Sequence, residues 1–317
     1  MAMPRRRRYD VAGRTVFITG AARGIGAAVA ERLHGAGANV ALVGLEPELL
    51  EALATRLGDR AAAFEADVTD FAALQHAVAG TMTRFGAIDV AIANAGISYI
   101  GRLATAPIEQ VERTLEVNLM GVWRTNRAVL HEVVARRGYL LNIASLSAAS
   151  HAPLMGAYTA SKAGVEALTD CLRVETAPSG ARVGCAYFGF IDTDLVTASF
   201  AHPSAQIMTA SLPKFVVRVA PLSDAVDAIE RGIQRRSARV WAPRYVGPVL
   251  ALRGMLQPLT ELQSKRSRQL PRALSLVDPA TGGLGDQHTK LGVAADAATE
   301  PDGGGADLAW RPSDPAS

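Results

Sequence analysis

The sequence predicts a doubly wound α/β protein built on a parallel sheet, and three features carry this prediction. Short apolar runs recur along the first 245 residues, stretches of helical length separate them, and a glycine-rich turn follows the first run directly. Strands that alternate with helices at this rhythm need right-handed crossovers, which place helices on both faces of a parallel sheet. We therefore expect one large α/β domain.

Seven apolar runs are the expected strands of this sheet. They lie at 15–18, 39–43, 62–66, 90–93, 139–144, 182–187 and 239–242. Helices are expected between and after them, at the following places: from the glycine turn to about Gly35, at about 46–57 and 70–85, along a stretch that includes Asn118, along one that includes Tyr158, and at about 223–235.

The pattern loosens beyond Gly189. Residues 195–211 favour a helix or lid. Residues 246–262 are apolar, and Pro248, Gly254 and Pro258 are expected to interrupt them, which favours a substrate-side cap or a surface-lying segment. From about Leu274 large apolar residues are scarce, so a disordered tail is expected. The expected division is a basic arm at 1–12, the α/β domain at 13–245 with a substrate loop at about 190–220, an apolar extension at 246–273 and a tail at 274–317.

Composition fits a soluble globular enzyme, since 49% of the 317 residues are hydrophobic and 20% are charged. The net charge of +3 gives no case for nucleic acid, although a basic run at 5–8 could contact an acidic surface. No signal-peptide core and no apolar run of membrane-spanning length is found. Cys171 and Cys185 lack metal-like spacing, so we expect buried thiols in a reducing compartment, a cytoplasmic location and no metal.

One helix is expected to carry an acid/base pair. Tyr158 and Lys162 are four positions apart, so both side chains would point into the same space. A phenol has a pKa of about 10, and a nearby cation lowers that pKa toward the range in which tyrosine can transfer protons at neutral pH. Ser145 ends the run 139–144, at the strand end where open α/β sheets bind ligands.

The first strand leads into a turn that can bind phosphate. Gly20, Gly24 and Gly26 stand between the strand and the helix, where glycine lets backbone N–H groups approach a pyrophosphate. This spacing favours a dinucleotide.

In this order the motifs resemble the classical branch of the short-chain dehydrogenase/reductase family, over about 13–193. Thr19-Gly20-x-x-x-Gly24-Ile25-Gly26 is similar to its cofactor loop, Asp67-Val68 to its adenine contact and Asn94-Ala95-Gly96 to its sheet-stabilising motif. The resemblance implies a Rossmann fold and a catalytic tetrad of Asn118, Ser145, Tyr158 and Lys162.

The resemblance also implies the roles of these residues in an NAD(P)-dependent oxidoreductase. Tyr158 would exchange the proton of the alcohol while a hydride passes to or from the nicotinamide, and Ser145 would hold the substrate oxygen. Lys162 would lower the pKa of the tyrosine and bind the nicotinamide ribose, and Asn118 would anchor a water in a proton relay. The expected cofactor contacts are Gly20, Ala22, Arg23, Gly24, Ile25, Gly26, Gly44, Leu45, Asp67, Val68, Asn94, Ala95, Gly96, Tyr158, Lys162, Gly189, Ile191 and Thr193.

Two departures from the family pattern bear on the cofactor. Phe188 replaces a usual proline, which could loosen the turn at the nicotinamide end. Gly44 and Leu45 stand where an acid marks NAD-dependent members or a base marks NADP-dependent ones. Arg23 could reach a 2′-phosphate, which favours NADP slightly, whereas Glu46 could bond a ribose.

The substrate segment is apolar. This suits a hydrophobic alcohol or ketone, and the same residues could equally close the core or an oligomer interface: Leu195, Val196, Phe200, Ile207, Met208, Leu212, Phe215 and Val216. The resemblance implies a homodimer or homotetramer. A non-catalytic dinucleotide-binding regulator, or a membrane-surface protein that uses 5–8 and 246–262, is the alternative.

Overall fold

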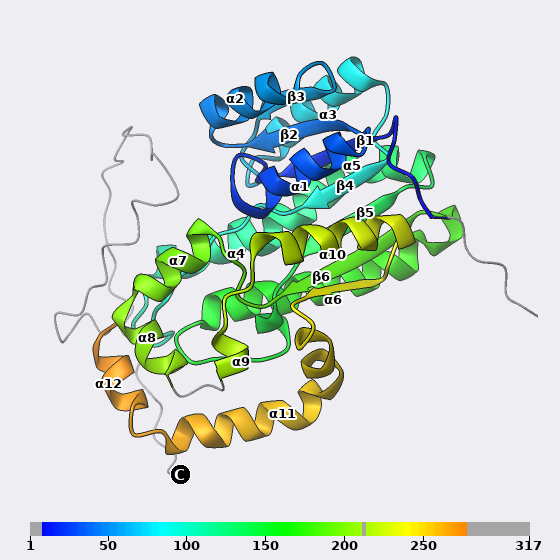
Figure 1. Ribbon diagram of the computed structural model, residues 1–317. Coiled ribbons are helices and arrows are strands. Elements are labelled where there is room, and N and C mark those ends of the chain that lie inside the picture. Colours follow the sequence, from blue (N-terminus) through cyan, green and yellow to red (C-terminus); the bar gives the residue numbers. More distant parts are fainter. Residues whose placement is uncertain (1–7, 211–213, 278–317) are drawn as a thin grey trace, which may run out of the picture.

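The computed structural model describes residues 8–210 and 214–277, and its centre is a seven-stranded parallel sheet (Figure 1). The strand order is β3-β2-β1-β4-β5-β6-β7, so the chain reverses direction across the sheet after β3. The strands are β1 Thr15–Thr19, β2 Asn39–Gly44, β3 Ala61–Glu65, β4 Val90–Ala93, β5 Tyr139–Ile143, β6 Arg182–Phe188 and β7 Arg239–Ala242. The predicted doubly wound architecture is confirmed, and no strand end differs from its expected position by more than one residue.

Helices cover both faces of the sheet, because alternate side chains of each strand point to opposite faces. Val16 and Ile18 of β1 join the apolar core under α1 Gly24–Gly35, α2 Pro47–Leu57 and α10 Leu222–Arg235. Phe17 joins the core under α3 Phe71–Phe85 and α5 Gly121–Ala135, and α6 Gly156–Thr176 extends that layer over β5 and β6. Strands buried on both faces are continuous apolar runs, which is why the sequence shows them clearly.

The stretch around Asn118 is not one regular helix. It consists of α4 Ile108–Leu115, a π-helical turn η1 Glu116–Met120, and α5. A π-helical turn inserts an extra residue per turn, and such turns are frequent at functional sites. Single-turn 3₁₀ helices follow at η2 Leu146–Ala148 and η3 Ala177–Ser179.

The carboxyl-terminal region is more ordered than the sequence indicates. It contains α7 Asp194–Ala201, α8 Pro203–Thr209, α9 Lys214–Val217, α11 Val246–Arg266 and α12 Leu270–Ser275. The expected interruption of 246–262 is wrong, because α11 is continuous: Pro248 lies in its first turn, where N–H groups have no intrahelical partner, and Pro258 lies within it. The helix α12 continues past 274, since Ala273 and Val277 are buried against Leu154; the rest of the expected tail, 278–317, lies outside the described residues.

Two smaller expectations also change. The end of the predicted arm belongs to the domain, because the Tyr9 N–H donates to the Gln234 carbonyl at 2.7 Å and Val11 is buried. Residues 1–7 lie outside the described part of the chain. Cys185 is buried as expected, but Cys171 is exposed on the outer side of α6. Among the described residues, no helix has both the length and the apolarity needed to cross a membrane.

Candidate active site

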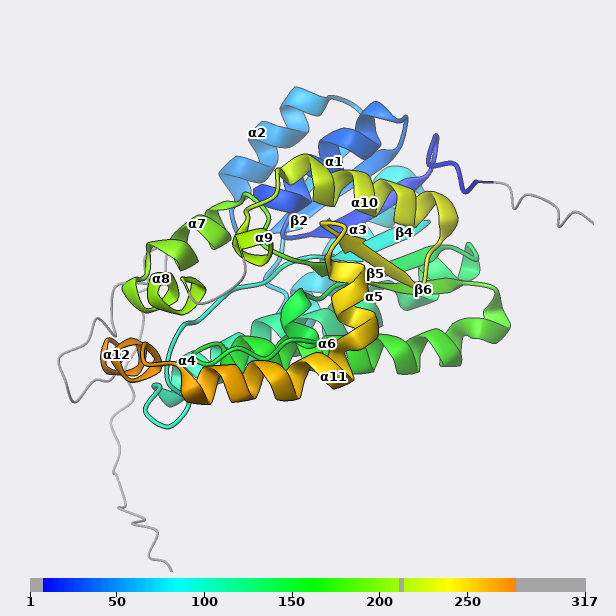
Figure 2. The same cartoon turned by 60° about the horizontal axis from the view of Figure 1, so that its bottom comes forward.

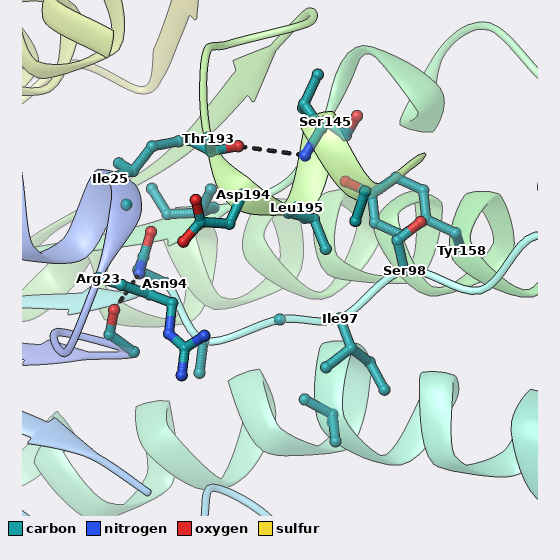
Figure 3. Close-up of a pocket in the computed structure, with 18 of the residues that line it drawn as sticks. Arg23, Ile25, Asn94, Ile97, Ser98, Ser145, Tyr158, Thr193, Asp194 and Leu195 are labelled. Atoms are coloured by element: carbon teal, nitrogen blue, oxygen red, sulfur yellow. Dashed lines mark hydrogen bonds between the residues drawn. The ribbon is translucent and has the colours of Figure 1, made fainter. Parts of the chain in front are cut away.

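A cavity of about 710 Å³ lies at the carboxyl ends of the strands, where the chain reverses direction across the sheet. Figure 3 shows its two ends, with Arg23 and Asn94 at one and Ser145 and Tyr158 at the other. Every expected cofactor contact except Gly26 lines this cavity. Sequence positions as distant as 20 and 193 therefore meet in one groove.

The glycine turn forms a cradle that side chains would fill. Gly20 and Gly24 have φ of +65° and +56°, the left-handed region that favours glycine. A Cβ on Gly20 would lie 2.8 Å from Ala95 Cα, and one on Gly26 would collide with the Gly20 carbonyl. The Asn94 amide holds the turn by donating to the Thr19 and Gly20 carbonyls, each at 3.1 Å. Gly26 therefore lies behind the groove and supports it.

The helix after this cradle begins without a side-chain cap. Arg23 occupies the position before α1 in extended conformation, and its side chain makes no capping hydrogen bond. The first N–H groups of α1 thus remain available, and the helix dipole favours an anion there. Close backbone approach and open N–H groups fit the pyrophosphate of a dinucleotide.

The cavity wall just after β3 contains an acid with a fixed orientation. Asp67 Oδ1 accepts from the Thr69 N–H at 2.8 Å, and Arg113 Nη2 lies 3.3 Å from Asp67 Oδ2. Burial raises the pKa of Asp67, but the hydrogen bonds from Thr69 and Arg113 outweigh it and bring the pKa below its usual value. Arg113 was missed in the sequence because no local pattern relates it to an acid in another element.

The two candidate residues for cofactor choice are paired with each other. Arg23 Nη2 lies 2.5 Å from Glu46 Oε1, and both side chains line the cavity beside Gly44. Their side chains are 44% and 34% exposed, so solvent screens the pair. The structure therefore places both the base and the acid at the position expected for the adenosine ribose.

Ser145 and Tyr158 meet at the other end of the cavity. Ser145 Oγ accepts from the Ser147 N–H at 3.1 Å, and both Ser145 and the half-buried Tyr158 line the cavity, whereas Ser147 does not. Burial raises the pKa of Tyr158, and a hydrogen bond with Ser145 is the contribution that lowers it. The net direction is opposite to the lowering expected from Lys162, because burial favours the neutral phenol.

Lys162 is buried below this pair. Its Nζ donates to the Ile143 carbonyl at 2.9 Å and lies 5.7 Å from the centroid of the Tyr158 ring. Burial lowers the pKa of Lys162 to about 8. A Cβ on Gly96 would lie 3.4 Å from this Nζ, so glycine leaves the ammonium group access to the groove.

Asn118 is fully buried in the π-helical turn and does not line the cavity. Its Oδ1 accepts from the Ile97 N–H at 2.8 Å, and its Nδ2 donates to the Ile97 carbonyl at 2.9 Å and to Ser161 Oγ at 3.2 Å. Both amide hydrogens are therefore used. The side chain fixes the segment after β4 against α6. The expected anchoring of a water by Asn118 stays a prediction.

The turn at Phe188 is held firmly. Phe188 is 5% exposed in the apolar core, and the Gly189 N–H donates to the Ala242 carbonyl at 2.9 Å. The expected loosening is absent because β7 pairs with this end of β6. Thr193 Oγ1 donates to the Ile191 carbonyl at 3.2 Å and accepts from the Val196 N–H at the start of α7.

The cavity also has apolar walls. Its walls include Ile97, Ile100, Leu195, Val196 and Ala198. Ser98 also lines it, and Ser98 Oγ is buried with no hydrogen-bond partner among the described residues. The sequence offered one signal for Ser98, its place two residues after Asn94-Ala95-Gly96 at a strand end.

The other described residues of the expected substrate segment, Phe200, Ile207, Met208 and Val216, do not line the cavity. The Phe200 ring packs against the Phe190 ring at a tilt of 53°, with centroids 4.8 Å apart, and Ile207 and Met208 pack against the cluster around Leu154 and α12. Leu212 and the side chain of Phe215 lie outside the described residues. Leu195 and Val196 therefore line the cavity, whereas Phe200, Ile207 and Met208 pack within the protein.

A parallel sheet, a glycine cradle and a Ser, Tyr and Lys grouped at one end define a dinucleotide-dependent oxidoreductase. A family model described as short chain dehydrogenase matches residues 14–204. The 2-(R)-hydroxypropyl-CoM dehydrogenase of Xanthobacter autotrophicus is 36% identical over 223 residues, which cover 67% of this chain and 89% of that protein. The 2,3-dihydro-2,3-dihydroxybenzoate dehydrogenase of Bacillus subtilis is 34% identical over 230 residues, which cover 69% and 88%.

Solved structures agree on the fold. A short chain dehydrogenase/reductase from Burkholderia phymatum in complex with NAD has a TM-score of 0.70 and 22% identity, with 80% of this chain and 96% of that chain covered. The chain therefore belongs to the short-chain dehydrogenase family, whose members are oxidoreductases that act on CH–OH groups with NAD or NADP.

Proposed function

We propose that this protein oxidises a hydrophobic secondary alcohol, or reduces the matching ketone, with Tyr158 as the general acid/base. One observation carries the proposal: a single cavity joins the glycine cradle to Ser145, Tyr158 and Lys162. When bound along this groove, a nicotinamide dinucleotide supplies the hydride chemistry. The protein's own residues have to orient the substrate and transfer the proton.

The residues at the catalytic end suit these tasks. Burial keeps the Tyr158 hydroxyl protonated, so it can donate to a carbonyl oxygen in reduction. In oxidation the same oxygen has to accept a proton, which the hydrogen bond with Ser145 and the neighbouring Lys162 ammonium would assist. Ser145 would also hold the substrate oxygen.

Replacement of Tyr158 by phenylalanine tests the proposal. General acid/base groups contribute about 100- to 10,000-fold to rate, so Tyr158→Phe should lower kcat by at least about 100-fold while NAD(P)H still binds. Turnover with apolar ketones and alcohols and nicotinamide fluorescence titration would measure the two effects. Tyr99→Phe is the matched control, because Tyr99 is a nearby tyrosine that does not line the cavity.

Two results would count against the proposal. A Tyr158→Phe protein with undiminished turnover would remove Tyr158 as the acid/base. A wild-type protein that binds the cofactor but turns over no alcohol or ketone would favour the non-catalytic regulator instead.

The cofactor preference that we infer is NADP, through Arg23. A 2′-phosphate could take over the guanidinium from Glu46, since charge-assisted hydrogen bonds to phosphate are strong. Arg23→Gln should then weaken NADPH binding by about tenfold or more and change NADH binding little. Glu46→Gln should strengthen NADPH binding. If Glu46→Gln weakens NADH binding instead and Arg23→Gln leaves NADPH binding unchanged, the preference is for NAD.

The substrate class rests on the apolar wall and on Ser98. Apolar walls favour a hydrophobic molecule, and one unpartnered hydroxyl beside the catalytic end favours an additional oxygen on it. The names of the two relatives describe compounds with hydroxyl groups on carbon, which supports an alcohol substrate.

Assembly and location remain predictions. The exposed Met120 and Trp123, near Asn118, support a homodimer or homotetramer through that surface. Light scattering would test this, and a monomer mass would contradict it. The expected cytoplasmic location would be tested by cell fractionation.

A further inference from the structure

The helix α11 packs Val246 and Leu250 on the protein, forms polar contacts with it further along, and leaves a row of large apolar side chains exposed to solvent. On the inner side, Arg253 Nη1 lies 2.6 Å from Glu166 Oε2, and Gln257 Oε1 accepts from the His151 N–H at 2.9 Å. An ordinary surface helix turns its large apolar side chains toward the core and its polar side chains toward solvent. The outer side of α11 is therefore the unusual one.

Four large apolar side chains form that outer side, which we call the α11 stripe. They are Leu252, Met255, Leu259 and Leu262, with exposures of 50%, 71%, 60% and 44%. Spacings of three, four and three residues place all four on one face of the helix. Figures 1 and 2 both show α11 along the outside of the molecule, and the exposure of these four side chains means that no described residue covers them. A contiguous exposed apolar stripe of this kind marks a contact surface.

Charge indicates what the α11 stripe contacts. Residues 246–277 contain five Lys or Arg side chains but only one acidic side chain, Glu261. Arg253 and Lys265 have acidic partners, whereas Arg266, Arg268 and Arg272 are exposed and form no ion pair within the described part of the chain. Arg266 follows Leu262 by four residues, so it continues the stripe with a cation.

An apolar stripe bordered by unpaired cations matches a bilayer surface that carries anionic lipid. Such a helix lies in the interface, with its apolar face among the acyl chains and its Lys and Arg side chains at the headgroups. A second copy of this segment is less complementary, because it would bring the same excess of positive charge to the contact.

We propose that α11 binds the surface of anionic lipid bilayers through Leu252, Met255, Leu259 and Leu262. The contact lies at the substrate side of the molecule: α12 packs against Leu154 and Ile100, and Ile100 lines the cavity. An apolar substrate dissolved in the bilayer would thus meet the protein near the cavity. This consequence rests on the proposed function, but the binding itself does not.

Co-sedimentation of the full chain with vesicles tests the proposal without any turnover. The probes are vesicles of phosphatidylcholine alone and of phosphatidylcholine with one third phosphatidylglycerol. We expect at least about tenfold stronger partitioning onto the anionic vesicles, falling as salt rises from low to high ionic strength. Equal partitioning onto both vesicles, or none onto either, would overturn the proposal.

Substitution of the stripe assigns the binding to α11. The variant Leu252→Gln, Met255→Gln, Leu259→Gln and Leu262→Gln keeps helix propensity and should lose at least about tenfold in partitioning. The matched control is Leu49→Gln with Val174→Ser, two exposed apolar residues on other helices, which should bind like the wild type. Wild-type binding by the stripe variant would refute the proposal.

A second set of variants keeps the test decisive if the stripe variant folds poorly. Arg266→Gln with Arg268→Gln and Arg272→Gln retains the apolar stripe and should lose the preference for anionic vesicles. This triple arginine variant is compared with one in which the basic run 5–8 is replaced. If the triple variant keeps its preference for anionic vesicles and the 5–8 variant loses it, the arm binds the vesicles and the proposal fails. If the stripe variant changes the mass in light scattering while no form binds vesicles, the stripe is a contact between copies and the proposal fails.

Discussion

The cofactor end and the carboxyl-terminal region of this protein are built differently. In β1 and β2 most side chains are fully buried, and the glycine cradle excludes even a Cβ at Gly26. In α7 no residue is buried, and in α11 only Val246 is. The first region is fixed by close packing, whereas the second is held by two small apolar clusters and a few polar contacts. Substitutions should therefore have large effects at the cofactor end and small ones in α11.

The largest effect is expected at Gly26. Gly26→Ala places a Cβ against the Gly20 carbonyl, which is backbone and cannot rotate away, so the cradle has to shift. We expect NAD(P)H affinity to fall by about 100-fold or more, together with a lower Tm. Fluorescence titration and thermal unfolding would measure both.

Gly35→Ala is the matched control in the same helix, because a Cβ there meets no described atom within 4 Å. It should leave cofactor affinity unchanged and stabilise the protein by up to about 1 kcal/mol. A Gly26→Ala protein that binds as well as Gly35→Ala would show that the cradle is not tightly packed.

An effect of intermediate size on stability is expected at Lys162. Substitution of this lysine should remove activity but make the fold more stable. The pKa of Lys162 is about 8 in the folded protein and 10.5 in the unfolded chain. The free-energy cost of burying the charged lysine is therefore fully present below pH 8. Wild-type stability should therefore rise between pH 8 and 10.5, as the lysine loses its proton. Lys162→Met should abolish turnover yet stabilise the fold at pH 7 by about 1–3 kcal/mol, the lower figure allowing for the lost hydrogen bond to Ile143.

Urea unfolding of both proteins at pH 7 and pH 10 would check this. The stabilisation should shrink at the higher pH, since the wild-type lysine is then largely neutral when folded. A Lys162→Met protein that is less stable than the wild type at pH 7 would show that the lysine is not buried as a costly charge.

The smallest effect is expected at Pro258, inside α11. Proline supplies no N–H for the bond to the carbonyl four residues earlier, so Pro258→Ala should strengthen the helix locally. Because α11 buries little, global Tm and cofactor affinity should hardly change. Amide hydrogen exchange along 246–266 should slow. If Pro258→Ala instead raised Tm by several degrees, α11 would unfold together with the core of the domain.

Much of the cofactor end could be predicted because its signals are local in sequence. Strands buried on both faces are uninterrupted apolar runs, and the turn at Gly20 and Gly24 needs left-handed backbone. The carboxyl-terminal region gave weaker signals. Proline in α11 suggested an interruption, but the helix continues because Pro248 lies in its first turn and Pro258 lies within an exposed helix.

The sequence by itself determined the doubly wound sheet and its strands, because periodicity and glycine spacing report backbone conformation over a few residues. Most of the predicted groove residues came from the family resemblance, and Arg113 and Ser98 were missed. Only the tertiary structure decided which distant side chains meet: Arg23 with Glu46, Asp67 with Arg113, and Arg253 with Glu166. It also decided the protonation tendencies of Tyr158 and Lys162. Burial sets those pKa values, and burial depends on every element packed around a side chain, which no local pattern encodes.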